Sequence, residues 1–333
     1  MPSETIDLSS VVMPTGSDEE MVFHTFRGYL AAVCVWIEML YPHPDGTMAG
    51  VAEAVRTRPW HAQPPRDRVL TARGAEILRN GWATEVLLNS PRVLGGDDLV
   101  SFANLWAPVQ SYYAVFNAFT AMAMTVTGSK PPKSHAALLT WAATQVAHPA
   151  SPFIVPWTAR VGGPPNAHTF EGFGRAVIDH GISNLSAPHA ANAPSLLAKA
   201  LRTTRREQID DHREGWRRGL RTAAGKPRKN LPTSVLVANA TALRPTTLFD
   251  LLWRLRVRSN YKEGDALLSG ALGPADAATF HDALCEIVAS TLLTVEIYLA
   301  ALVGKATLER CAMSLSVPRS LAPRSVRARI DLW

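Results

Sequence analysis

The chain has 333 residues, of which 47% are apolar and 19% charged, and its formal net charge is +6. This apolar fraction supplies enough side chains for a hydrophobic core and excludes a disordered or collagen-like protein. The three cysteines, Cys34, Cys285 and Cys311, are too few and too scattered for a disulfide framework. They indicate buried free thiols in a reducing compartment.

Neither a secretion signal nor a membrane span is expected. Residues 1–20 are polar and acidic before any apolar run begins. The longest apolar stretches are interrupted by charged residues such as Arg27 and Glu38, or carry polar side chains at helical spacing. We therefore expect a cytoplasmic protein that does not enter a membrane.

Four helices are predicted before residue 150, because apolar residues recur there near the helical period of 3.6. They cover residues 20–41, 71–89, 108–127 and 134–146. The first three end where prolines or glycines follow, and residues 59–66 form a connector. We assign residues 1–70 to a leader with the first helix, and expect the main bundle to begin at residue 71.

The middle of the chain, residues 149–235, is predicted to be an insertion. Residues 149–194 contain seven prolines and five glycines without a sustained period, so they are expected to be irregular apart from one short helix at 173–180. A helix is predicted over 195–220, followed by a break at 225–232. Residues 234–237 are the best candidate for a strand, and a weak one.

Two further helices are predicted over residues 246–269 and 275–303, and a basic tail over 314–333. The sequence therefore predicts an all-α protein. Its helical bundle covers residues 71–313 and is interrupted by the irregular and basic insertion.

The positive charge is concentrated between residues 199 and 230, where eleven basic residues face four acidic ones, so the rest of the chain is close to neutral. Such a segment favours a polyanion as partner, although a solvated helix face with paired charges has the same composition. A tryptophan among arginines could stack on unpaired bases or could pack between helices. The candidate nucleic-acid-binding residues are Arg205, Arg206, Arg213, Trp216, Arg217, Arg218 and Arg221.

Common catalytic and cofactor motifs are missing from the sequence. It has no phosphate-binding G-x-x-x-x-G-K-[ST] loop, no dinucleotide fingerprint, no Cys-x-x-Cys, no histidines four apart and no serine-hydrolase elbow. We therefore expect neither a cofactor nor a metal.

One cluster of polar residues lies in the predicted helix 246–269. Arg254, Arg258 and Tyr261 follow one another at i, i+4 and i+7, so they share one helix face. Guanidinium groups and a phenol on one face offer donors that suit a phosphodiester. Alternatively, these arginines pair with acidic residues of the bundle, for which the candidates are Asp250, Glu263, Asp265, Glu286 and Glu296.

Residues 109–141 contain a Tyr-Tyr-x-x-Phe-x-Ala run, then a glycine turn and a Lys-x-His. The residues of this pattern are Tyr112, Tyr113, Phe116, Ala118, Gly128, Lys133 and His135. With this pattern the segment resembles the HEPN-domain superfamily. Residues 79–90 resemble the helix that precedes this run, and residues 255–267 resemble a later helix of the family. The resemblance extends over residues 72–305, with the interruption at about 149–235.

The resemblance implies a helical bundle, usually dimeric, of the kind found in prokaryotic toxin–antitoxin and phage-defence systems. Many such proteins cut RNA without a metal by an Arg-x(4–6)-His motif. Arg254 takes the arginine position here, and Asn260 stands where the histidine would lie. Asn117 also stands where relatives often carry histidine. Asparagine cannot exchange a proton near neutral pH, so the comparison favours a non-catalytic branch.

If the protein is an enzyme, the candidate catalytic residues are Arg254, Arg258, Asn260 and Tyr261. A phenol with a pKa near ~10 is a poor base, and His135 is a candidate by residue type alone. We expect a HEPN-like protein that binds nucleic acid, RNA rather than DNA, in bacterial defence or toxin-type regulation. The alternatives are a metal-independent endoribonuclease that uses Arg254 and Arg258, and a structural subunit that binds a partner protein. The resemblance also implies a homodimer in which the helices at 246–269 meet and place both Arg258 side chains in one cleft.

Overall fold

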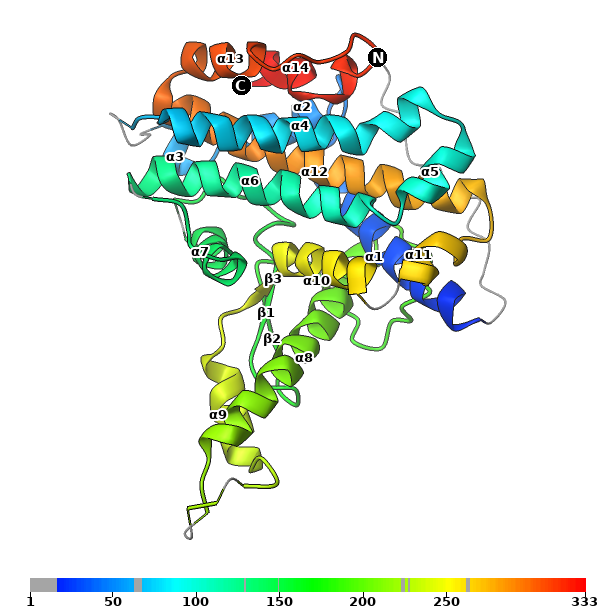
Figure 1. Cartoon of the computed structure of the whole chain (residues 1–333), viewed down its shortest axis with the longest axis vertical. Helices are drawn as coiled ribbons and strands as arrows, with labels where there is room; N and C mark the ends of the chain where they lie inside the picture. Colours follow the sequence, from blue (N-terminus) through cyan, green and yellow to red (C-terminus); the bar gives the residue numbers. More distant parts are fainter. Residues whose placement is uncertain are drawn as a thin grey trace.

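The structure is a computed structural model that describes residues 17–62, 68–128, 130–148, 150–222, 225–226, 228–261 and 264–333. Helices account for most of these residues, and the strands are short, so the prediction of an all-α protein is confirmed. Figure 1 shows a bundle of long helices lying side by side and an arm that projects from one side of it.

The bundle is built around α12, Pro274–Val303, which has 30 residues. By length, and by the mean hydropathy of 1.8 of its most apolar window, it is the one helix among the described residues that could cross a membrane. However, 78% of its most apolar window is buried, as in the core helix of a bundle. The helices packed against it are α1 (Asp18–Leu40), α2 (Thr47–Arg56), α4 (Ala72–Leu94), α5 (Asp97–Ala103), α6 (Ala107–Thr127) and α13 (Lys305–Met313).

Local capping explains why three helices begin or end within two residues of the predicted positions. The Ser17 hydroxyl accepts a hydrogen bond from the Glu20 N–H at 3.1 Å and starts α1. The Ser134 hydroxyl caps α7, His135–Ala147, in the same way. Gly128 closes α6 with a φ of 64°, a left-handed conformation that glycine adopts without strain.

The helix α4 continues to Leu94, five residues beyond its predicted end, with Pro91 inside it. Proline has no N–H to donate to the carbonyl four residues earlier, which is that of Leu87. The Ser90 hydroxyl donates to this carbonyl instead, at 2.7 Å. The prediction that Pro91 stops the helix was wrong because a side chain replaces the missing backbone bond.

Three short helices, α2, α3 (Pro59–Ala62) and α5, lie in segments where the sequence predicts no helix. None exceeds ten residues, so none fills the window of about 11–18 residues over which apolar periodicity becomes recognisable.

The proline-rich segment forms two strands and no helix at 173–180. In a three-stranded antiparallel sheet, β1 (Arg160–Gly162) lies between β2 (Thr169–Glu171) and β3 (Thr246–Thr247). The predicted short helix is replaced by extended chain and turns, because Phe173 packs on Trp36 with ring centres 5.6 Å apart and Gly174 takes a φ of 63°.

The chain after the sheet also differs from its prediction. Residues 234–237, the strand candidate, lie in α9, Thr233–Ala242, which packs on α8, Ala193–Gly219. Residues 246–269 contain β3, α10 (Leu248–Tyr261) and α11 (Gly264–Ser269) rather than one helix. Short apolar runs fit strands and helices equally well, so the packing partner decides between them.

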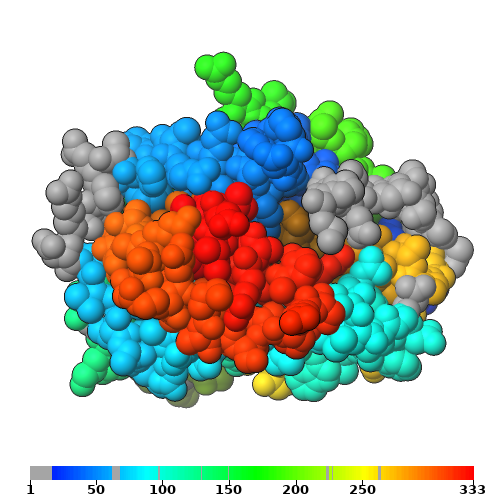
Figure 2. Space-filling model, turned by 90° about the horizontal axis from the view of Figure 1, so that it is seen from above, coloured from blue at the N-terminus to red at the C-terminus, as the bar shows by residue number. Residues whose placement is uncertain are grey.

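The C-terminal segment is folded onto the bundle rather than extended as a tail. Figure 2 shows α13 and the residues after it lying over the middle of one face. Arg329 is buried and pairs with the carboxylates of Glu85 and Glu296, both of which are fully buried. Arg327 donates to the Leu315 carbonyl at 2.9 Å. These two arginines therefore hold the chain end in place, whereas Arg319 is exposed.

Candidate nucleic-acid interface

The arm is the far half of α8 together with α9 and the loop between them. The first half of α8 packs against α1 and α10 and is buried, and from Asp210 onward the helix is exposed apart from Trp216 and Arg217. Figure 1 shows α8 leaving the bundle at α10, with α9 beside its far end. We call residues 206–242 the arm.

Arg205 holds the arm in place and does not face solvent. Its side chain is fully buried, and its guanidinium donates to the carbonyls of Gly163, Ala240, Leu243 and Arg244. Ala240 and Leu243 lie at the C-terminal end of α9, where carbonyls lack partners within the helix. The prediction that Arg205 binds nucleic acid was wrong, because its donors are used to cap α9 and join it to α8.

Most of the other basic residues of the arm are accessible. Three acidic residues, Asp210, Asp211 and Glu214, are exposed among them, and Arg213 lies 4.0 Å from Asp210. The positive charge therefore exceeds the negative charge on this surface. The exposed basic side chains are Arg206, Arg213, Arg218, Arg221, Lys226, Arg228 and Lys229.

Glu214 organises the end of α8. It forms ion pairs with Arg217 and with Arg218, and hydrogen bonds from these two arginines lower its pKa to about 2. Arg217 also donates to the Arg228 carbonyl at 2.8 Å, which ties the loop back to the helix. Arg217 thus has a structural role, while 74% of the Arg218 side chain is exposed. Trp216 is half-buried, and its ring centre lies 5.8 Å from that of His212.

The predicted arginine face of α10 is closed by α8. Arg254 and Arg258 both pair with Glu207, and both guanidinium groups lie over the ring of Phe26. Burial alone would raise the pKa of Glu207, but the charges and hydrogen bonds of the two arginines outweigh burial and lower it. The alternative of an ion pair is therefore observed, but the acid is Glu207, which is not one of the five candidates.

Of the acids proposed as partners, two pair with other arginines and one lies outside the described residues. Asp250 pairs with Arg244, and Glu296 pairs with Arg329. Asn260 and Tyr261 are exposed at the end of α10, with Tyr261 73% exposed, and Glu263 lies outside the described residues. The structure thus brings Arg254 and Arg258 together but places no histidine in contact with them among the residues it describes.

Arg256 lies on another side of α10 from Arg254 and Arg258, in an aromatic cluster with α6 and α7. Its Nη2 donates to the Tyr113 hydroxyl at 3.1 Å, and its guanidinium carbon lies 4.7 Å from the centre of the Trp253 ring. The Tyr112 hydroxyl and His135 Nδ1 are 3.0 Å apart, and the His135 ring lies 4.5 Å from that of Phe116. We call these six side chains the aromatic cluster.

Two titratable groups of the aromatic cluster are neutral at pH 7. Burial lowers the pKa of His135, and the positive charge of Arg256 lowers it further. Burial raises the pKa of Tyr112, which therefore keeps its proton. His135 was a candidate by residue type alone, and its contact with Arg256 was not predicted. The sequence did contain a signal for this difference. Arg254, Arg256 and Arg258 are spaced two residues apart, and residues two apart lie on different helix faces, so Arg256 could be expected to point away from the other two.

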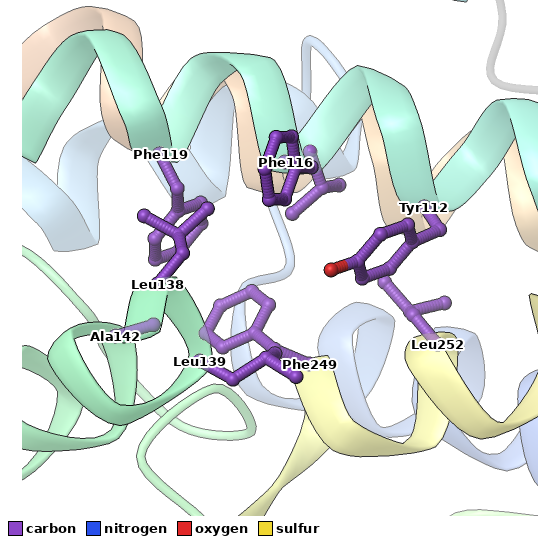
Figure 3. A pocket seen from close by; sticks show the side chains of 9 residues that line it. Tyr112, Phe116, Phe119, Leu138, Leu139, Ala142, Phe249 and Leu252 are labelled. Atoms are coloured by element: carbon purple, nitrogen blue, oxygen red, sulfur yellow. The ribbon is translucent and has the colours of Figure 1, made fainter. Parts of the chain in front are cut away.

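A small apolar pocket lies beside the aromatic cluster, between α6, α7 and α10 (Figure 3). Tyr112 and Phe116 belong to both the pocket and the cluster. The complete lining is Tyr112, Val115, Phe116, Phe119, Leu138, Leu139, Ala142, Phe249 and Leu252. Such a lining suits an apolar group and provides no partner for a charge.

The described residues contain no group of three or more histidine, cysteine, aspartate or glutamate side chains that could hold a metal ion. Comparison of the chain with known protein families, with curated proteins and with solved structures found no match.

Proposed function

We propose that this chain is a HEPN-like helical protein that binds nucleic acid through the arm, with RNA as the preferred ligand and without cutting it. The observation that carries the proposal is the set of seven exposed basic side chains on the projecting arm. The acidic side chains near them are fewer, and one of these acids, Glu214, is paired with Arg217 and Arg218. Each lysine or arginine that contacts a phosphate releases a counterion, which favours binding.

A non-catalytic role is supported by the residues at the positions of the HEPN motif. Asn260 cannot exchange a proton near neutral pH, and Tyr261 is exposed, so neither offers an effective base. Arg254 and Arg258 already neutralise Glu207. The RNA preference and a role in bacterial defence or toxin-type regulation rest on the HEPN resemblance alone.

The predicted homodimer through α10 stays a prediction. The two Arg258 side chains could meet in one cleft only if Glu207 and Phe26 moved away from them, because both now cover that face. A dimer that uses another face of the bundle is compatible with the arm as the binding surface.

Charge reversal on the arm tests the proposal. We expect Arg218→Glu with Arg221→Glu to weaken binding of a labelled single-stranded RNA at least about tenfold, and equally for different sequences, because phosphate contacts carry no sequence information. Arg217 is left intact because it also holds the loop. The melting temperature should stay unchanged, since exposed charges contribute little to stability. Binding is measured by fluorescence anisotropy in EDTA.

The matched control is Arg319→Glu, an exposed arginine of the C-terminal segment, which should bind RNA like the wild type. Equal loss in the control would show non-specific attraction to the whole molecule. Unchanged binding in the arm variant would refute the proposal. RNA cleavage in EDTA that is lost in Arg254→Ala would establish the endoribonuclease instead, and absence of any binding would favour the partner-subunit alternative.

A further inference from the structure

Arg256 differs from the other two arginines of α10 in its electrostatic environment. Arg254 and Arg258 share Glu207, whereas no carboxylate of a described residue pairs with Arg256. Its positive charge is instead stabilised by the rings of Trp253, Tyr113 and Tyr112, at 4.7, 5.3 and 5.8 Å. A half-buried guanidinium without an acid retains its full attraction for an anion.

The hydrogen-bonding capacity of the aromatic cluster is also incompletely used. A guanidinium has five N–H donors, and the Arg256 guanidinium makes one hydrogen bond within the described residues, to Tyr113. Its Nε is buried and has no partner. His135 is neutral near pH 7 and uses only Nδ1, in its bond with Tyr112. The Nε of Arg256 is enclosed, but the Nη donors that Tyr113 does not use and the Nε2 of His135 can be offered to an oxyanion without a competing negative charge.

The rings around Arg256 provide flat surfaces next to these donors. Tyr113, Phe116 and Trp253 are each half-buried, so none of the three residues is fully enclosed in the core. Unpaired bases stack on aromatic rings and on guanidinium planes, whereas bases within a duplex are covered by their neighbours. The adjoining pocket is too apolar for the polar edges of a base, so a base would lie on the cluster and not in the pocket.

We propose that the aromatic cluster binds one nucleotide unit, with the phosphate on Arg256 and the base stacked on the rings. This inference rests on the proposed function, because it assumes that the arm binds nucleic acid. It adds that the bound nucleic acid is a single strand rather than a duplex. The helix α10, which carries Arg256, packs against both α6 and α8, and the arm is the continuation of α8 (Figure 1). A strand held by the arm would gain affinity by placing one nucleotide in the cluster.

The first experiment titrates the whole protein with AMP, adenosine and inorganic phosphate by calorimetry. We expect AMP to bind more tightly than adenosine or phosphate. The substitution Arg256→Gln removes the positive charge and should therefore weaken AMP binding at least about tenfold. Trp253→Leu should weaken AMP binding as well. Trp253→Phe should keep most of the wild-type affinity for AMP, because phenylalanine still offers a ring. Arg319→Gln is the control. Equal affinity of AMP for wild type and Arg256→Gln, or no AMP binding, would overturn the proposal.

The second experiment separates a free nucleotide from a strand. A ten-nucleotide single-stranded RNA should bind more tightly than AMP and than a duplex of the same length, and Arg218→Glu with Arg221→Glu should remove that advantage while AMP binding stays unchanged. If the arm variant loses RNA binding but Arg256→Gln does not, the cluster is not part of the interface and the proposed function stands. If AMP binding requires Arg256 but RNA does not bind at all, the proposed function fails and the cluster is a site for a free nucleotide.

Discussion

His24 is buried in the bundle beside an ion pair, and neither of its ring nitrogens has a hydrogen-bond partner. The neighbouring pair joins Arg27 to Asp276, and His24 Nε2 lies 3.8 Å from the Asp276 carboxylate. Burial, helped by the charge of Arg27, lowers the pKa of His24 to about 4. Because Arg27 already neutralises Asp276, a proton on His24 would be a buried charge with little compensation.

This environment makes the stability of the fold depend on pH. The folded pKa lies below that of an unfolded histidine, so the unfolded chain takes up the proton first as pH falls. The contribution of neutral His24 to the free energy of unfolding is complete above about pH 6.5 and is lost as the pH falls towards 4. We expect wild type to lose about 2 to 3 kcal/mol more than His24→Leu between pH 7 and 4.5, measured by urea unfolding. His148→Leu, at an exposed histidine, should follow wild type, and a parallel decline in all three proteins would contradict this assignment.

At the scale of elements, the contact between α8 and α10 determines which arginines are available. Glu207 on α8 joins Arg254 and Arg258, and Arg205 on α8 joins the end of α9. The same helix therefore fixes the arginine face to the bundle at one end and carries the arm at the other. Arg254 and Arg258 are expected to stabilise the fold rather than to bind the nucleic acid.

Replacing both arginines separates these roles. Arg254→Gln with Arg258→Gln should lower the free energy of unfolding by about 2 to 3 kcal/mol, because Glu207 loses charged hydrogen bonds in a half-buried site. Adding Glu207→Gln should recover part of this loss, since the unpaired carboxylate is then removed. RNA affinity measured on the folded variants should stay at the wild-type value. Unchanged stability together with lost RNA binding would show that this face is the binding site after all.

Helix positions were predictable wherever an apolar period and a capping residue agree, as at Ser17 and at Gly128. Side-chain partners across the fold were not, because the ion pair of Arg258 spans 51 residues of sequence and nothing local to either residue indicates it. The charge count identified the segment of the arm, but it could not separate Arg205, which is buried, from Arg206, which is exposed. That distinction depends on where α9 ends against α8.

For the molecule as a whole, the distribution of arginines separates the arm from the bundle. Those that pack into the bundle are held by carboxylates, as at Arg329 and Arg254, by backbone carbonyls, as at Arg327, or over rings, as at Arg256. Those of the arm beyond Arg205 are mostly exposed. A protein close to electrical neutrality elsewhere thus carries its excess positive charge on one projecting element, which is where a polyanion would be attracted first.

The salt dependence of RNA affinity tests this view most directly. For a single strand, each phosphate contact contributes about −0.7 to the slope of log affinity against log salt concentration, so seven exposed basic residues allow a slope between about −2 and −5. We expect Arg218→Glu with Arg221→Glu to make the slope shallower by about 1 to 2, and Arg319→Glu to leave it unchanged. A slope near zero in wild type, or the same steep slope in wild type and the arm variant, would contradict binding through the arm.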